Sequence, residues 1–320
     1  YKTAISGNGN AVVVSRVCVY SSSSTDNNTV HIFLLNDTDY NERQVLLSNA
    51  RSEFGTSLLL SANGEVLIVG SPGIVADGAQ VVSGRVSLIL WNSTSLEYNS
   101  VRTLDPQENK VMRFGDSVAL STDGTRLAVG APASRNFVGA VFLYALNWTS
   151  LESTTGYKLE LAKDHTDGAM KFGSAVAMSK DGNVLVVGVP GAACEGMLNP
   201  SGAVAIFETP PFGSDTSMKL LQMPCLVSTE VDHPARYMGA SVTCSHDAST
   251  ILVGVPGNID GGAVAVFTRP KTTNGTPYFL KTLMANANFN TSLAVGRSVS
   301  LSHDGAVAFI SSDRGVFIVS

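Results

Sequence analysis

The sequence predicts an all-β fold, a β-propeller of four-stranded antiparallel blades, with six blades as the direct count. Two observations carry this prediction. A unit of roughly 58 residues recurs along the whole chain. Five of the six units contain a tight-turn dipeptide between short apolar runs, and no apolar period of 3.6 residues persists as a helix would require. A seventh blade supplied from outside these residues is the alternative.

The 320 residues divide into one propeller domain with no separate second domain. A serine before the first turn of each unit sets the register, at Ser6, Ser61, Ser121, Ser179, Ser245 and Ser302. The predicted blades cover residues 1–53, 54–113, 114–171, 172–237, 238–294 and 295–320. The last blade is incomplete, because the chain ends after what reads as a third strand.

Each unit predicts four strands in a fixed order. The first strand leads to a tight turn such as Asp123-Gly124, a dipeptide that takes positive φ at low cost. The second is a β-branched run such as 184–187, and the third begins with glycine, as at 139–144. The fourth, such as 157–161, is weaker and more polar. This gradient is typical of a blade whose inner strands are buried on both faces and whose outer strand lies at the rim.

A large apolar residue followed by glycine opens five of the units. We expect the large residue to fill the wedge between neighbouring blades, and the glycine to let strands approach closely near the axis. The five structural pairs are Phe54-Gly55, Phe114-Gly115, Phe172-Gly173, Met238-Gly239 and Val295-Gly296. A Gly-x-Pro triplet ends the second strand in four units, where proline withholds a hydrogen-bond donor from the sheet.

The composition excludes several classes of protein. The chain has 44% hydrophobic and 15% charged residues and a formal net charge of −5. It is too apolar to be disordered, and it lacks the basic surface that nucleic acid requires. No apolar run is long enough to span a bilayer, and no signal-peptide pattern stands at the start. Because a mature chain has lost its signal peptide, the latter does not argue for the cytosol.

The pattern Phe-Gly-x-Ser-Val-x-Leu-Ser-x-Asp-Gly, followed by Val-Gly-x-Pro and Gly-x-Val-x-x-Phe, resembles the FG-GAP repeat of the integrin α-chain propeller. The copies from Phe114 and Phe172 match best, and the resemblance covers nearly the whole chain. It implies an extracellular propeller used for adhesion or protein interaction. Integrin-type repeats often carry a calcium loop, but each first turn here offers at most one acidic residue. A calcium ion requires six or more oxygen ligands, so we expect no metal and no cofactor.

Six Asn-x-Ser/Thr acceptors predict N-glycosylation in a secretory protein. They are Asn27, Asn36, Asn92, Asn147, Asn274 and Asn290. Three of them fall directly after a third strand, in a hairpin expected at the exposed rim. The alternative is unmodified polar turns, and intact mass before and after deglycosylation distinguishes the two.

Four cysteines lack the spacing of a zinc site. Cys194 and Cys225 are expected on one face of the fourth blade, so a disulfide between them is predicted. Two free buried thiols are the alternative. Cys244 lies within an inner strand and reads as a packed thiol, whereas Cys18 has no evident partner.

No catalytic motif stands in the sequence, and the five histidines, at positions 31, 165, 233, 246 and 303, are scattered. A propeller enzyme would require reactive residues near the starts of the inner strands. Those positions offer Ser57, Asp116, Ser117, Ser174, Ser241, Arg297 and Ser298. Because no copy pairs the recurrent serine with a histidine, we expect it to satisfy backbone groups. The sequence therefore predicts no catalytic residues.

Together these features predict a secreted, non-catalytic glycoprotein propeller for cell-surface adhesion or protein–protein interaction. The alternatives are a module of an extracellular filament or coat, with its last blade completed by a neighbouring subunit, and a glycan-binding or glycan-processing propeller. A protein partner is expected on the face opposite the glycosylated hairpins. That face includes the loops at 76–81, 164–168 and 192–199.

Overall fold

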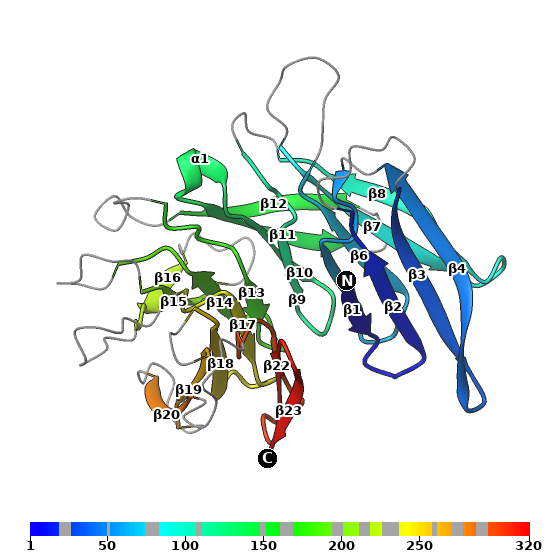
Figure 1. Cartoon of the computed structure of the whole chain (residues 1–320). Helices are drawn as coiled ribbons and strands as arrows, with labels where there is room; N and C mark the ends of the chain where they lie inside the picture. Colours follow the sequence, from blue (N-terminus) through cyan, green and yellow to red (C-terminus); the bar gives the residue numbers. More distant parts are fainter. Residues whose placement is uncertain are drawn as a thin grey trace.

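The computed structural model describes residues 1–18, 27–49, 52–73, 83–106, 111–147, 152–160, 169–193, 201–210, 218–225, 237–257, 261–270, 278–285 and 294–320. Their strands form six antiparallel sheets arranged as a β-propeller (Figure 1). The predicted fold class is therefore confirmed. Among the described residues, no helix is long and apolar enough to cross a membrane.

Each of the first three sheets has four strands that pair in chain order. The first blade consists of β1 (Lys2–Ile5), β2 (Ala11–Arg16), β3 (Asn27–Asn36) and β4 (Asp39–Asn49). The second consists of β5 (Ser57–Leu60), β6 (Val66–Ser71), β7 (Arg85–Asn92) and β8 (Glu97–Leu104). The third consists of β9 (Ser117–Leu120), β10 (Arg126–Ala131), β11 (Ala140–Asn147) and β12 (Glu152–Leu159). A short turn of helix, α1 (Ser134–Phe137), which the sequence did not predict, joins β10 to β11.

The remaining sheets repeat the same order. The fourth blade consists of β13 (Val176–Met178), β14 (Val184–Val189), β15 (Ala203–Glu208) and β16 (Lys219–Gln222). The fifth consists of β17 (Ser241–Cys244), β18 (Thr250–Val255), β19 (Ala263–Thr268) and β20 (Phe279–Ala285). The sixth has three strands in the described residues, β21 (Val299–Leu301), β22 (Ala308–Ser312) and β23 (Gly315–Val319).

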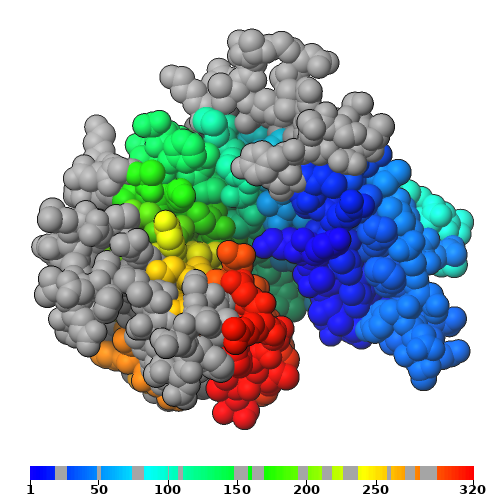
Figure 2. Space-filling model, viewed as in Figure 1, coloured from blue at the N-terminus to red at the C-terminus, as the bar shows by residue number. Residues whose placement is uncertain are grey.

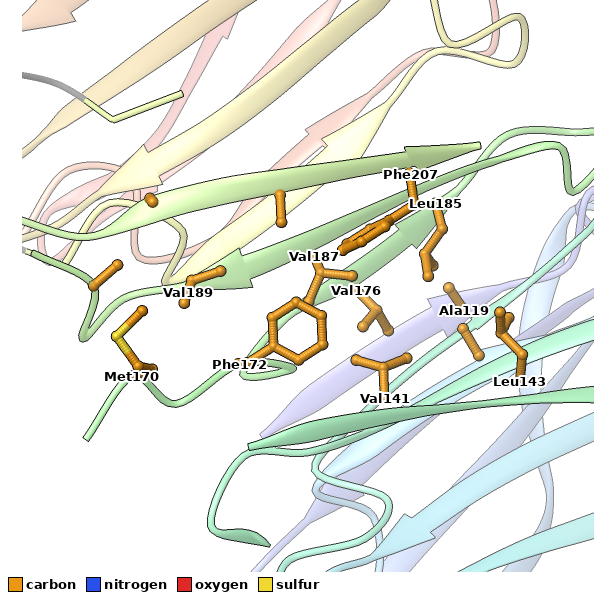
Figure 3. Close-up of a cluster of buried hydrophobic side chains, with 14 residues drawn as sticks. Ala119, Val141, Leu143, Met170, Phe172, Val176, Leu185, Val187, Val189 and Phe207 are labelled. Atoms are coloured by element: carbon orange, nitrogen blue, oxygen red, sulfur yellow. The ribbon is translucent and has the colours of Figure 1, made fainter. Parts of the chain in front are cut away.

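The large residue that opens five of the units is buried between two blades. Phe172 is fully buried and packs against Val141 of the third blade and Val187 of the fourth (Figure 3). Its ring also meets that of Phe207 edge to face, with 6.0 Å between the centroids. Burying a side chain of this size contributes roughly 1.5–3 kcal/mol, so these wedges are a main source of cohesion between blades.

Glycines make the blades fit together near the axis, and Gly130 shows why. A Cβ atom at Gly130 would lie 2.1 Å from the carbonyl oxygen of Gly173 in the next blade. Gly173 itself has a φ of +90°. Only glycine therefore suits both sides of this contact. The same clash arises at Gly70, Gly188 and Gly254.

The first turn of each blade is held by a serine and an acidic or amide side chain. In the fourth blade, the Ser179 hydroxyl donates to Asp181 Oδ1 at 2.6 Å, and the Val184 amide donates to Ser179 Oγ at 2.9 Å. The Asn183 amide also donates to Asp181 Oδ1, at 3.0 Å. These bonds fix the hairpin and so the register of the inner strand.

The inner strands contact one another in chain order from β1 to β21. Between the first blade and the sixth, the space-filling view shows a hollow where the ring is open (Figure 2). Apolar side chains of the first and sixth blades that face this opening are more exposed than the equivalent side chains of the four blades between them.

Candidate functional site

A turn that occurs five times directly precedes the inner strands, and so lies at the end of the propeller where these strands begin. The turn runs from the residue before each large residue–glycine pair to the residue after it. In the third blade, the Asp116 amide donates to the Arg113 carbonyl at 3.2 Å. The first and fourth positions of these turns are Glu53 and Thr56, Arg113 and Asp116, Lys171 and Ser174, Tyr237 and Ala240, and Ala294 and Arg297. We call these ten residues the strand-start mouth.

The first residue of every such turn has a left-handed backbone. The φ angles are +50° at Glu53, +59° at Arg113, +56° at Lys171, +63° at Tyr237 and +46° at Ala294. A non-glycine residue in this region costs roughly 1–3 kcal/mol, and such strain clusters at functional sites. The backbone of the strand-start mouth is therefore in a conformation that is locally unfavourable, and the surrounding structure maintains it.

Three charged side chains meet at this mouth across two blades. Arg113 Nη2 lies 2.6 Å from Asp116 Oδ1 and 3.1 Å from Glu53 Oε2. The side chains of Glu53 and Asp116 are 22% and 19% exposed, and that of Arg113 is 38% exposed. Burial alone would lower the pKa of Arg113, but the two carboxylates more than offset it and raise that pKa. The guanidinium therefore stays charged. Within the described residues, its Nη1 and Nε have no hydrogen-bond partner.

A second strained segment adjoins the mouth. Arg135, Asn136 and Phe137 in α1 have φ angles of +51°, +59° and +68°. The Lys171 amide donates to the Phe137 carbonyl at 2.8 Å. The strained segment is therefore fastened to the turn that carries Lys171.

The opposite end of the channel is narrowed by the first turns. Thr122 Oγ1 of the third blade lies 2.9 Å from His246 Nε2 of the fifth. The rings of His246 and His303 lie 3.4 Å apart between centroids. Burial, followed by the charge of His303 and of Lys180, lowers the pKa of His246. These two histidines, which are far apart in the sequence, thus lie side by side, and with Thr122 they bring the first turns of three blades together at this end.

The recurrent serines bond to the backbone, as predicted. Ser57 Oγ donates to the carbonyl of Gly115 at 2.7 Å, and Ser117 Oγ donates to that of Gly173 at 2.8 Å. Ser241 Oγ donates to the carbonyl of Gly296 at 2.8 Å. Each hydroxyl fastens one blade to the next. Ser174 at the mouth donates instead to the carbonyl of Lys171, at 2.8 Å.

The predicted glycosylation sites lie on strands or outside the described residues. Asn27 and Asn36 are exposed at the two ends of β3, and Asn147 is exposed at the end of β11. Asn92 ends β7, and its Oδ1 accepts the Thr94 amide at 2.8 Å. Asn274 and Asn290 lie outside the described residues. Glycosylation at all six stays a prediction.

The cysteines fall into two groups. Cys18 and Cys244 carry free thiols, and burial, with the charge of Asp247, raises the pKa of Cys244 to about 12. Cys225 is disulfide-bonded, but Cys194 lies outside the described residues. The pairing of these two therefore stays a prediction. No group of three or more histidine, cysteine or acidic residues that could hold a metal ion occurs in the described ranges.

Most of the predicted partner face lies outside the described residues. The residues outside the described ranges are 76–81, 164–168 and 194–199. At the near edge of the last loop, Ala192 is fully buried in the core between the third and fourth blades. A role for these loops in binding a protein stays untested.

The fold is similar to those of several bacterial proteins. The periplasmic gluconolactonase of Pseudomonas aeruginosa matches 99% of this chain and 79% of its own, at 13% identity and a TM-score of 0.68. A putative 6-phosphogluconolactonase of Bacteroides fragilis matches 96% of this chain and 75% of its own, at 12% identity and a TM-score of 0.61. A protein from Lactobacillus plantarum matches 99% and 79%, at 12% identity and a TM-score of 0.63. No family model matches the sequence, and no curated protein is similar to it.

These comparisons correct two predictions. The resemblance to the FG-GAP repeat of integrins is wrong, because no family model matches and the similar structures are gluconolactonase-like propellers. The prediction of a non-catalytic adhesion protein is also wrong, because the named neighbours are enzymes rather than adhesion proteins. The physical reason is that the Phe-Gly and Gly-x-Pro residues hold blades together. These residues are therefore evidence for the propeller fold and not for a function.

Sequence reasoning found part of the strand-start mouth. Asp116, Ser174 and Arg297 stand among the positions considered for a propeller enzyme, and the structure places them at one end of the channel. Glu53, Arg113, Lys171 and Tyr237 were missed. The signal was present, because the residue before each large residue–glycine pair is charged or aromatic in four of five copies.

Proposed function

We propose that this protein hydrolyses sugar lactones at the strand-start mouth. The observation that carries the proposal is the contact of Glu53, Arg113 and Asp116 on strained turns at the end of the channel. The named neighbours of the fold, a gluconolactonase and a putative 6-phosphogluconolactonase, supply the substrate class. Strained, partly buried charged groups that converge at a channel end are typical of catalytic sites.

Lactone hydrolysis requires a base and a stabiliser of negative charge, and both are present. Glu53 or Asp116 accepts a proton from water as the water oxygen attacks the carbonyl carbon. Arg113 donates from Nη1 or Nε to the carbonyl oxygen, which becomes an oxyanion. The ring C–O bond then breaks, and the departing alkoxide takes the proton back from the carboxyl group. The product is an open-chain hydroxy acid, and no further reactant is needed.

Arg113 is suited to this role by its surroundings. The two carboxylates fix the guanidinium plane through Nη2, so its remaining donors point in directions set before substrate arrives. Preorganised donors of this kind contribute roughly 3–4 kcal/mol to stabilising an oxyanion. Tyr237, which is half exposed on the same end of the channel, offers an amphipathic ring for a sugar face.

The experiment measures hydrolysis of glucono-1,5-lactone by pH-stat, with spontaneous hydrolysis subtracted. Arg113→Met is expected to lower kcat/KM by 10²–10³-fold, the loss that follows removal of one oxyanion donor. Glu53→Gln and Asp116→Asn identify the base, because only the base variant loses most of kcat. Arg85→Met is the matched control, since Arg85 also pairs with a carboxylate, Asp105 at 2.8 Å, but outside the mouth. Wild-type protein with no rate above background, or equal losses in Arg113→Met and Arg85→Met, would contradict the proposal.

The same neighbour supports a location outside the cytoplasm. The Pseudomonas aeruginosa protein is named as periplasmic, in agreement with the sequence prediction of a secretory-pathway protein. Recovery of the protein in the extracytoplasmic fraction of its source cells tests this location. Recovery in the cytoplasmic fraction alone would contradict it.

A further inference from the structure

A crevice of about 440 Å³ lies between the first and second blades. Its walls are formed by β4 of the first blade, by β6, β7 and β8 of the second, and by the segment 52–54. Ligand sites have volumes of roughly 300–1,000 Å³, so the crevice is large enough for a small molecule. It adjoins the strand-start mouth, because Ser52 and Phe54 flank Glu53 in the chain. The described residues that line it do not include Glu53, Arg113 or Asp116, so the chemistry of the mouth does not account for this crevice.

The second blade carries polar residues on this wall where other blades are apolar. Ser71, Arg85 and Ser87 lie on the face of the second blade that meets the first. The residues in the same register of the third, fourth and fifth blades are all apolar and buried, and they pack in the clusters that join each blade to the one before it. In the third blade they are Ala131, Ala140 and Phe142, and in the fourth they are Val189, Ala203 and Ala205. The propeller fold therefore does not require polar groups at these positions.

Two of these polar side chains are buried without a hydrogen bond. Ser71 and Ser87 are 5% and 8% exposed, and within the described residues neither hydroxyl has a hydrogen-bond partner. By contrast, the hydroxyl of Ser57, which is also buried, donates to the Gly115 carbonyl. Native proteins leave few buried polar groups unpaired, because each of them has lost its hydrogen bonds to water. Since both hydroxyls line the crevice, they indicate an occupant that bonds to them.

The polar and apolar residues of the crevice lie at different ends. In the sheet register, the polar residues gather near the start of β7, and the apolar residues lie further along it. The polar end is formed by Ser71, Ser87 and Thr103, with Ser48 of the first blade. The apolar end is formed by Ile89 and Val101, with Leu46 of the first blade. A ligand that fits both ends is amphiphilic.

The crevice offers no unbalanced charge to a ligand. Arg85 is the one charged residue among the described residues that line it, and its Nε lies 2.8 Å from Asp105 Oδ1. The side chains of this pair are 47% and 46% exposed, so the pair lies at the edge of the crevice in contact with solvent. An ion that leaves water for a partly apolar site needs an opposite charge to offset its lost hydration. The crevice therefore favours an uncharged ligand.

We propose that this crevice binds an uncharged amphiphile, an apolar chain that ends in a hydroxyl or carbonyl group. The polar end of the ligand bonds to the hydroxyls of Ser71 and Ser87, and its chain covers Ile89, Val101 and Leu46. A serine hydroxyl both donates and accepts, so it suits either kind of polar group. Binding here is separate from lactone hydrolysis and does not depend on it.

Water alone suits only one end of the crevice. A buried water molecule makes about three hydrogen bonds to polar partners, whereas apolar cavities stay dry. Ser71 and Ser87 offer such partners, but the side chains of Ile89 and Val101 offer none. A chain with one polar end bonds to the two hydroxyls and also buries the apolar surface, which favours binding.

The first experiment is isothermal titration of the whole chain with 1-octanol as the probe. Octanoate and octylammonium are the matched charged probes, because their chains have the same length. We expect saturable binding of 1-octanol. Both charged probes should bind at least about tenfold more weakly, because each carries an unpaired charge into the crevice.

The second experiment removes the two hydroxyls together, with Ser71→Ala and Ser87→Ala in one chain. Alanine occurs at the equivalent positions as Ala131 and Ala205, so the fold accepts it there. The double variant should bind 1-octanol roughly tenfold more weakly, because two hydrogen bonds to the ligand are lost. Its melting temperature without ligand should not fall, because the hydroxyls have no partner in the fold. Ser300→Ala, on the exposed side of β21, is the control and should change neither measurement.

A third experiment keeps both serines and therefore does not depend on the folding of the double variant. Val101 is 59% exposed at the edge of the crevice, so Val101→Cys leaves the core intact. Saturating 1-octanol should slow its alkylation by iodoacetamide about fivefold or more, because a bound ligand excludes solvent from its site. Leu220→Cys is the control, since Leu220 is 40% exposed on β16 of the fourth blade, and its alkylation rate should not change.

Four results would overturn the proposal. They are the absence of saturable 1-octanol binding, binding of octanoate or octylammonium as tight as that of 1-octanol, equal affinity of wild type and the double serine variant, and alkylation of Val101→Cys that 1-octanol does not slow. None of these measurements involves lactone hydrolysis, so they test the crevice independently of the mouth.

Discussion

The third blade and the two blades at the opening are made from the same repeat but are buried differently. In the third blade, the central strand β10 is buried at five successive positions from Leu127 to Ala131. In the first blade, β2 alternates between buried and half-buried residues over Ala11–Ser15. In the sixth, Phe309 of β22 is exposed between the buried Ala308 and Ile310. The same pattern of apolar residues thus gives a two-sided core only where blades stand on both sides.

This difference shows that the repeat encodes contacts as well as strands. A blade with a neighbour on one side keeps its hydrogen-bonded register, because that register depends on its own turn and its own strand pairs. Its strands, however, are buried on only one of their two faces. The contribution of one residue to stability should therefore depend on where its blade lies in the ring, even when the local sequence is the same.

The largest expected effect is at the wedge residue Phe114. It is fully buried, and its ring meets that of Phe142 at 5.4 Å between centroids. Phe114→Ala should lower the free energy of unfolding by about 3–5 kcal/mol, as truncation of a buried phenylalanine does. Phe309→Ala at the opening should lower it by less than about 1 kcal/mol, because the side chain is already partly in water. Urea denaturation measures both, and equal losses would contradict the comparison.

A smaller effect is expected where glycines of adjacent blades meet. Gly130→Ala places a Cβ atom 2.1 Å from the Gly173 carbonyl oxygen and should cost about 1–3 kcal/mol. The sixth blade has Ser311 at this position, where no following blade is present, and Ser311→Ala should cost about 1 kcal/mol or less. Thermal unfolding checks the pair. A Gly130→Ala protein as stable as wild type would show that the blades yield more readily than the contact suggests.

The blades were predictable because the contacts that hold them repeat. The sequence predicted the inner strands and their turns, since residues such as Gly130 meet a local need that recurs in each repeat. It placed the fourth strand of the third blade at 157–161, whereas β12 covers Glu152–Leu159, because this more polar strand lacks a recurring signal. The left-handed turn over Arg135–Phe137 was not predicted, because three adjacent non-glycine residues with positive φ contradict local preference. Only the surrounding structure maintains that conformation.

The candidate site was predictable only in part, for a different reason. Asp116 stands near a strand start in the sequence, but its contact with Glu53 through Arg113 joins two repeats. An alignment of the repeats identifies residues that the copies share, and it gives no signal at positions where the residue type differs between copies. Glu53, Arg113 and Lys171 differ from one another at a single shared position, so the repeat placed that position on the channel but did not identify its chemistry.

The smallest effect is expected at the first turns, where the fourth and sixth blades carry the same hydrogen bonds. Burial alone would raise the pKa of Asp181, but hydrogen bonds from Ser179 and Asn183 lower it further than burial raises it. Asp304 accepts the equivalent bonds from Ser302 and Ala306, and its pKa is likewise lowered. A carboxylate with a lowered pKa stabilises the fold above its ordinary pKa, and this contribution is lost as the pH falls through the folded value. Asp181→Ala should therefore lower the free energy of unfolding by about 1 kcal/mol at pH 7 and by less in acid. Asp304→Ala should lower it by a smaller amount, because water competes for the hydrogen bonds of Asp304.

Asp181→Asn is the control, because it keeps the acceptor oxygen. It should retain most of the stability while removing this pH dependence. Urea unfolding of the three variants at pH 7 and pH 3 measures the difference, and an equal loss from both alanine variants would show that the turns act independently of the neighbouring blades.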